Sequence, residues 1–200
     1  MIAPAVPTPK KESPSEEEYN LTTRQVNDSP AAVPKPEMIE TELPLETPWT
    51  LYMFAKSTNP SDNWISGMKN VVTVKTVQEF WGVMNNLKSL MKIRVDLYFF
   101  RSDITPMWED EANCNGGRIR FTINKKMYNL DDVWTELTLA AVGEHFPPEE
   151  INGIDINCRR GKFSIWTRGQ ENVEECNDVI KNCLFYANIE EETELVFSNH

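Results

Sequence analysis

From residue 43 onward the chain repeats short segments in which apolar and polar side chains alternate, and this pattern constrains the fold most strongly. One such segment places Ile119, Phe121 and Ile123 at every second position. Because successive side chains of a strand point to opposite faces, each segment predicts a strand with one apolar face. The predicted strands cover residues 49–53, 93–99, 119–123, 154–158, 163–166 and 194–198. Strands that are half polar favour an antiparallel sheet with one covered face.

Three other segments have the helical period. The first begins at the capping box Thr76–Glu79 and continues to Leu87, and the second runs from about Asn129 to Gly143. The third starts near Glu171 and aligns apolar residues through Leu184. Strands and helices in this order predict an α+β fold, in which one antiparallel sheet carries the helices on one face.

Composition divides the chain near residue 43. Residues 1–42 contain many of the 13 prolines, the acidic run Glu16–Glu18 and no sustained apolar period, which predicts a disordered acidic, Pro-rich tail. Residues 43–200 are expected to form the single folded domain. The sequence contains no apolar run long enough for a transmembrane helix, and its start lacks the pattern of a secretory signal.

The charge and the cysteines exclude several classes of function. A formal net charge of -11 argues against a general nucleic-acid coat, so any contact with nucleic acid should be small and local. The cysteines form no C-x-x-C pair, and the two histidines complete no metal-ligand spacing. We therefore expect four small buried thiols in a reducing cytosol and neither metal nor cofactor. The residues concerned are Cys114, Cys158, Cys176, Cys183, His145 and His200.

The dipeptide Trp108-Glu109 suits a flat, positively charged base. An indole face attracts a delocalised cation, and a carboxylate accepts hydrogen bonds from N–H groups on the edge of a base. Trp64 ends a loop-like segment and could supply a second stacking face, or it could pack down on the sheet. The neighbouring acids Asp110 and Glu111 have no histidine, nucleophile elbow or phosphate-binding loop beside them, so we expect no catalytic residue and no enzyme.

Basic side chains gather in an otherwise acidic chain. Arg159, Arg160 and Lys162 occupy a predicted tight hairpin, and Arg118 and Arg120 share one face of a predicted strand. Such a group of five cations suits phosphate oxygens. The alternative is a basic sheet edge that discourages edge pairing. Alternation places Trp166 on the same face as Lys162.

The predicted helices have more apolar surface than one sheet face requires. Val77, Trp81 and Met84 lie beside the core stripe of the first helix, and Leu139 falls opposite the main stripe of the second. Exposed apolar residues that cluster mark a docking site, and Trp is favoured at the centre of such sites. The alternative is a wide core face.

Four motifs together resemble the eukaryotic translation initiation factor 4E family over about residues 43–198. They are Thr76–Trp81, Pro106–Asp110, Asn115–Arg118 and Lys162–Thr167. The resemblance implies a single curved antiparallel sheet of about seven to eight strands, with three helices on its convex face. It also implies a cytoplasmic protein that binds the 7-methylguanosine cap of mRNA and acts in translation initiation or its regulation.

The resemblance assigns roles to individual residues. Trp64 and Trp108 would enclose the methylated guanine, Glu109 would accept from its edge, and Trp166 would touch its methyl side. The remaining cap-binding positions would hold the phosphates, with Arg159 and Arg160 as alternatives at one of them: Arg118, Arg159, Arg160 and Lys162. A helical motif of a 4G-type scaffold or a 4E-binding repressor would dock on Pro44, Val77, Trp81, Glu136 and Leu139.

The chain departs from the family pattern at several points. Leu43 precedes Pro44 where the family has His, Ile119 replaces a Trp, and Thr135 replaces a Leu of the partner site. The hairpin at Arg159–Lys162 is two residues shorter than usual, and the loop before Trp64 is about two residues longer. These departures keep open an alternative, a diverged interaction module or a translational repressor with weak cap binding.

Overall fold

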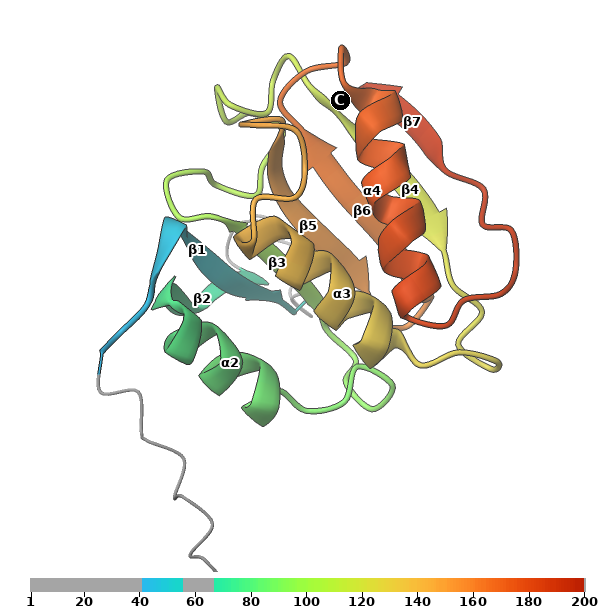
Figure 1. The fold of residues 1–200 in the computed structure, drawn as a ribbon, viewed down its shortest axis with the longest axis horizontal. Helices are drawn as coiled ribbons and strands as arrows, with labels where there is room; N and C mark the ends of the chain where they lie inside the picture. The colour runs from blue at the N-terminus through green and yellow to red at the C-terminus, as the bar shows by residue number, and fades with distance from the viewer. Residues whose placement is uncertain (1–40, 56–66, 200) are drawn as a thin grey trace, which may run out of the picture. The chain divides into compact units, whose positions relative to one another are not determined.

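Seven strands form one antiparallel sheet in the computed structural model, which describes residues 41–55 and 67–199. The strands stand in the order β2-β1-β3-β5-β6-β4-β7 (Figure 1). Their bounds are β1 Pro44–Phe54, β2 Met68–Thr76, β3 Asp96–Arg101, β4 Gly117–Thr122, β5 Ile151–Asn157, β6 Lys162–Thr167 and β7 Val196–Asn199. The α+β class agrees with the sequence prediction, and the strand number agrees with the seven to eight strands that the family resemblance implies.

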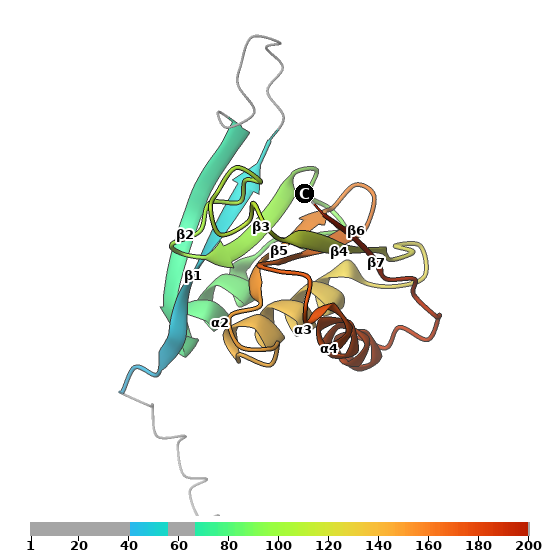
Figure 2. The ribbon, with the colours of Figure 1, turned by 90° about the horizontal axis from the view of Figure 1, so that it is seen from above.

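Three helices, α2 Val77–Asn86, α3 Leu130–Val142 and α4 Val173–Tyr186, lie on one side of this sheet (Figure 2). The predicted capping box starts α2, because the Thr76 side chain accepts from the amide of Glu79 at 3.2 Å. The Glu79 carboxylate reaches back to the amide of Lys75 at 2.6 Å. In the part of the chain described here, no helix is long and apolar enough to cross a bilayer.

The core lies between the helices and the covered sheet face. Trp49 of β1 stacks on Phe99 of β3, with ring centroids 5.2 Å apart, and Phe80 of α2 packs against the same Phe99 ring. Farther along the sheet, Phe121 and Phe163 stack at 5.4 Å. The four strand residues among these are apolar members of the alternating segments, so burial of that face holds the helices on the sheet.

Several local predictions need correction. The edge strand β2 was not predicted, because its exposed Lys69, Asn70 and Val71 blur the alternation. Strand β3 begins at Asp96 rather than at residue 93, and β7 runs two positions later than predicted at its start. Cys114 is exposed, whereas Cys158, Cys176 and Cys183 are buried as predicted. The boundary between tail and domain near residue 42 remains a prediction.

Candidate functional site

The face of the sheet opposite the helices is polar and holds acids, bases and aromatic rings together. Alternation puts these side chains there, because each lies next to a core residue along its strand. Strands β3 and β5 supply acids and aromatic rings, and β6 and β4 supply bases and the indole. The members are Asp96, Tyr98, Phe100, Asp155, Asn157, Lys162, Ser164, Trp166, Arg118 and Arg120.

Trp108 and Glu109 stand out from this sheet on the loop that joins β3 to β4. The Trp108 side chain is 61% exposed, an unusual state for the largest apolar residue, and Glu109 is also exposed. In the described residues no hydrogen bond or ion pair holds the Glu109 carboxylate. An indole face and a carboxylate are therefore both open to a ligand at the same place.

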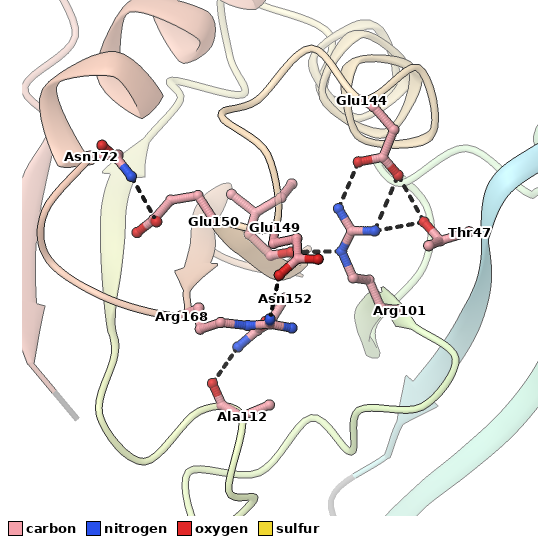
Figure 3. A network of polar contacts seen from close by, with 10 residues as sticks. Thr47, Arg101, Ala112, Glu144, Glu149, Glu150, Asn152, Arg168 and Asn172 are labelled. Carbon is pink, nitrogen blue, oxygen red and sulfur yellow. Dashed lines mark hydrogen bonds and ion pairs between the residues drawn. The ribbon is translucent and has the colours of Figure 1, made fainter.

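Buried asparagines hold this loop. The Asn113 amide, fully buried, donates to the carbonyls of Thr105 at 2.9 Å and Met107 at 2.7 Å. Asn152 of β5 donates to the Ala112 carbonyl at 2.6 Å and to the Asn113 side-chain oxygen at 2.9 Å; the bond to Ala112 is drawn in Figure 3. The loop is thus fixed to the sheet on both sides of Trp108, which reduces the entropy lost when a ligand binds.

Trp166 lies almost buried on the open face, at 3% exposure. Its ring packs edge-on against Phe100 at 5.3 Å, and the guanidinium of Arg118 lies 4.4 Å from its centroid. Its indole N–H donates to the Asp155 carboxylate at 2.7 Å. The structure thus places the predicted residues Trp166 and Arg118 in direct contact.

Asp155 is the acid at the centre of this face. Burial raises the pKa of its carboxyl to about 6, against the opposing effects of the Trp166 hydrogen bond and the Arg118 charge. Tyr98, its cross-strand neighbour on β3, has its pKa raised by burial and by the charges of Asp155 and Asp96. Burial also raises the pKa of Asp96.

The basic hairpin connects β5 to β6 at the far end of the face. Gly161 closes the turn with φ +67°, a conformation that favours glycine. The Arg159 side chain donates through Nε to the Arg94 carbonyl at 3.0 Å, and Arg160 is exposed. Lys162 borders a hollow of about 440 Å³ that Arg120 and Glu194 also line.

The predicted group of five cations is divided in space, which corrects the sequence interpretation. Arg118 pairs with Trp166 in register, whereas Lys162 pairs with Thr122, four residues farther along β4. At about 3.3 Å per residue this separates the two backbone positions by about 13 Å. Arg120 donates to the side chain of Ser198 on β7. Arg159, Arg160 and Lys162 stay together at the hairpin, and Arg120 lines the same hollow as Lys162. Of the five, Arg118 stands apart, over Trp166.

The predicted partner residues lie on the helical side of the molecule. Pro44 pairs in register with Thr76, directly before Val77, so both lie at the start of α2. Trp81 on α2 is 38% exposed, and Leu139 on α3 is 37% exposed. Glu136 and Leu139 line a groove of about 440 Å³ between α3 and α4, and a smaller groove of about 200 Å³ separates α2 from α3.

Sequence reasoning missed three residues and could not place a fourth. Asp155, Asn113 and Asn152 were not singled out, and Trp64 lies outside the described residues. Alternation with Ile154 and Ile156 was enough to put Asp155 on the open face. Only the pairing of β5 with β6 brings its carboxylate to Trp166.

The fold and the open polar face of the sheet place this chain in one class of protein. Members of this class are α+β proteins that have a single sheet, with helices on one side and an open polar face on the other. Residues 44–200 match the family described as eukaryotic initiation factor 4E, and the chain belongs to that family. This family comprises translation factors rather than enzymes. The eukaryotic translation initiation factor 4E of Candida albicans is 36% identical over 161 residues, which cover 76% of this chain and 74% of that protein.

Solved structures of the family share the fold. A complex of Ascaris suum eIF4E-3 with an m2,2,7G cap superposes with a TM-score of 0.69 at 29% identity, covering 80% of this chain and 92% of that one. A schistosome eIF4E complexed with m7GpppA and 4E-BP gives a TM-score of 0.68 at 26% identity, covering 79% and 89%.

Proposed function

We propose that this chain binds the 7-methylguanosine cap of mRNA on the open face of its sheet, and that it acts in translation initiation or its regulation. Trp108 and Trp64 stack on the two faces of the methylated base, and Glu109 accepts hydrogen bonds from its N–H edge. Trp166 meets the methyl side. Stacking contributes about 1–3 kcal/mol per aromatic face, and the positive charge of the methylated base adds to it.

The observation that carries this proposal is the exposed Trp108-Glu109 pair on a loop that Asn113 and Asn152 hold rigid. Without a ligand, a half-exposed indole beside a carboxylate has no packing function. With a cationic guanine, the indole gains a cation–π contact and the carboxylate gains two N–H donors. Family membership, with cap complexes of Ascaris and schistosome relatives, points to the same ligand.

The phosphate bridge of the cap extends toward the hairpin in this proposal. Lys162 and one of Arg159 and Arg160 hold the phosphates there. Arg159 keeps its terminal nitrogens available, because its bond to the Arg94 carbonyl uses Nε. Arg118 lies at the other end of β4, over Trp166, and its charge acts beside the base.

Titration with 7-methyl-GTP and with GTP, followed by tryptophan fluorescence, tests the proposal. The two ligands share the triphosphate, so a preference for the first measures recognition of the charged base. Glu109→Gln should weaken the binding of 7-methyl-GTP by roughly 1.5–3 kcal/mol, which is the contribution of hydrogen bonds to a charged acceptor. Equal, weak quenching of the unmodified chain by both ligands would refute the proposal.

Two tryptophan variants provide the matched comparison. Trp108→Ala should abolish the preference for the methylated ligand. Trp81→Ala removes an indole that is also exposed but lies on α2, behind the sheet. Loss of binding in both variants would indicate a general structural effect instead of a cap site.

We also infer that the helical side receives a short helical motif from a scaffold of the 4G type or from a 4E-binding repressor. Exposed Trp81 and Leu139, with the groove beside Glu136, support a helix-in-groove contact. The schistosome relative was solved with a 4E-BP, which favours the same class of partner. Trp81→Ala should then prevent capture of such a peptide and leave 7-methyl-GTP binding intact.

The rival function is an interaction module that has kept the fold but binds cap weakly. Thr135 lines the α2–α3 groove with Met84 and Leu87, and its hydroxyl donates to the Asp131 carbonyl at 2.8 Å. The groove therefore has a short side chain where a leucine would give a larger apolar contact. Cap resin and immobilised peptide separate the two functions. Retention by the peptide alone, in the unmodified chain, would establish the rival.

A further inference from the structure

Asp155 occupies a particular position on the open face, halfway along β5. Toward one end of β5, Asn152 bonds the loop that carries Trp108. At the other end, Asn157 precedes the basic hairpin and pairs with Lys162. A nucleotide whose base stacks on Trp108 and whose phosphates reach the hairpin must pass over the middle of this strand. Asp155 is the only carboxylate of β5 among the described residues.

The Asp155 carboxylate bonds the indole that faces the base. One oxygen accepts from the Trp166 indole N–H at 2.7 Å, and the other accepts from the Ser164 hydroxyl at 3.3 Å. Phe100 packs against the same indole edge-on, and a side chain at Gly153 would collide with that phenyl ring. This hydrogen bond and this aromatic contact both contribute to the orientation of Trp166.

Charge gives Asp155 a second effect. The guanidinium of Arg118 lies 4.4 Å from the centre of the Trp166 ring, so a positive charge adjoins the face that receives a cationic base. Like charges repel at this range unless a neighbouring negative charge compensates. Asp155 is the carboxylate that compensates Arg118 there, because it bonds the same indole.

We propose that Asp155 is a positioning and specificity-determining residue of the cap site, which orients Trp166 and offsets Arg118 so that the face accepts a cationic base. The inference rests on the cap binding proposed above and goes beyond it. It assigns part of the discrimination between 7-methylguanine and guanine to a residue that need not touch the ligand. Asp155→Asn preserves the size of the side chain but removes its charge, which leaves the Arg118 charge uncompensated.

The expected effect is specific to the methylated ligand. In Asp155→Asn the affinity for 7-methyl-GTP should fall about threefold to tenfold, the range for one unit charge acting across a partly screened site. Affinity for GTP should stay the same or rise slightly, because GTP has no positive base to repel. The ratio of the two dissociation constants is therefore the readout, since the shared phosphates cancel.

The pH dependence of that ratio is a readout that a purely structural role would not change. The charges that act on Asp155 are those of Arg118 of β4 and Asp96 of β3, and Tyr98 of β3 pairs with it in register. Arg120 of β4 lies in the same cross-strand row, with Ser164 of β6 between the two residues. Burial raises the pKa of Asp155 to about 6. Its charge, and with it the methyl preference, should grow as the pH rises from about 5 to about 7, and this growth should be absent in Asp155→Asn.

Asp96→Asn is the matched control. Asp96 is the other carboxylate on this part of the face, but its hydrogen bond comes from Asn157 at 3.1 Å and it does not bond Trp166. The Asp96→Asn variant should keep the preference, and the pH dependence should persist but move to slightly lower pH, because the Asp96 charge contributes to the raised pKa of Asp155. Arg118→Gln gives a second test: removal of the repelling cation should raise the ratio in favour of 7-methyl-GTP, even if total affinity falls.

The outcomes separate the inference from the function on which it rests. A methyl preference in the unmodified chain that drops in Asp155→Asn, loses its pH dependence there and rises in Arg118→Gln establishes the inference. An unmodified chain without any preference overturns the proposed function and the inference together. If the unmodified chain prefers 7-methyl-GTP and Asp155→Asn has the same preference at every pH, the inference alone is overturned. Should Asp155→Asn fail to fold, Arg118→Gln decides: an unchanged or lower ratio overturns the inference.

Discussion

The guanidinium of Arg101 lies 2.7 Å from the carboxylate of Glu144 and joins the end of β3 to the residue that follows the α3 cap (Figure 3). Arg101 also donates to the Ile151 carbonyl at 3.0 Å and to the Thr47 hydroxyl at 2.6 Å. Its guanidinium lies 5.0 Å from the centre of the Trp49 ring. One buried cation thus connects β1, β3 and β5 with the helical layer.

Loss of the Glu144 charge should destabilise the fold. Glu144→Gln leaves Arg101, which is 7% exposed, without its counter-ion. The Glu144 side chain is 28% exposed, so solvent screens part of the effect, and the free energy of unfolding should fall by about 1–2 kcal/mol. Glu149→Gln is the control: its pair with Arg168 is exposed, and its removal should change stability by less than about 0.5 kcal/mol. Equal losses in urea unfolding would contradict this expectation.

The same pair predicts how stability depends on pH. Although burial raises it, hydrogen bonds from Arg101 and Thr47 bring the pKa of Glu144 below its ordinary value. A lowered folded-state pKa contributes stability that is present above the unfolded value, about 4.3, and is lost as the pH falls through the folded pKa. The stability difference between the unmodified chain and Glu144→Gln should therefore be full near neutrality and shrink below about pH 4. A difference that is constant over this range would refute the assignment.

Sequence patterns predicted those parts of the fold that depend on residues close together in the sequence. The alternation of Ile119 and Phe121 identified β4, and Thr76 with Glu79 located the start of α2. The edge strand β2 was not predicted because its first half is largely exposed to solvent, and exposed positions need not be apolar.

The site could be predicted only in part, because some of its contacts join residues that are far apart in the sequence. Trp108 and Glu109 are adjacent in sequence, and their exposure follows from the loop that contains them. The bond between Asn113 and Asn152 joins residues 39 positions apart, and only strand pairing brings them together. Register likewise decided that Arg118 covers Trp166 instead of joining Lys162 at the hairpin.

Removal of the Asn113 side chain should loosen the Trp108 loop. Asn113→Ala removes the bonds from Asn113 to the Thr105 and Met107 carbonyls and the bond from Asn152, each of which contributes about 0.5–1.5 kcal/mol to stability. Because the loop is then less ordered, affinity for 7-methyl-GTP should fall with stability. Asn115→Ala, two residues away and exposed, should change neither quantity. Urea unfolding and ligand titration of both variants provide the measurement; an Asn113→Ala variant with full affinity would show that the loop needs no anchor.

Two glycines should respond to alanine with opposite signs. At Gly153 a Cβ would approach ring carbons of Phe100 at 2.3 Å, and Phe100 has no free space because it packs on Trp166. Gly153→Ala should therefore cost about 1–3 kcal/mol of stability and weaken binding of 7-methyl-GTP through the displaced indole.

At Gly82, inside α2, a Cβ meets nothing within 4 Å. Gly82→Ala should raise stability by about 0.5–1 kcal/mol, because alanine loses less backbone entropy in a helix, and should leave ligand binding unchanged. If thermal unfolding showed both variants shifted in the same direction, the packing of Phe100 between Gly153 and Trp166 would not be the constraint that fixes the indole.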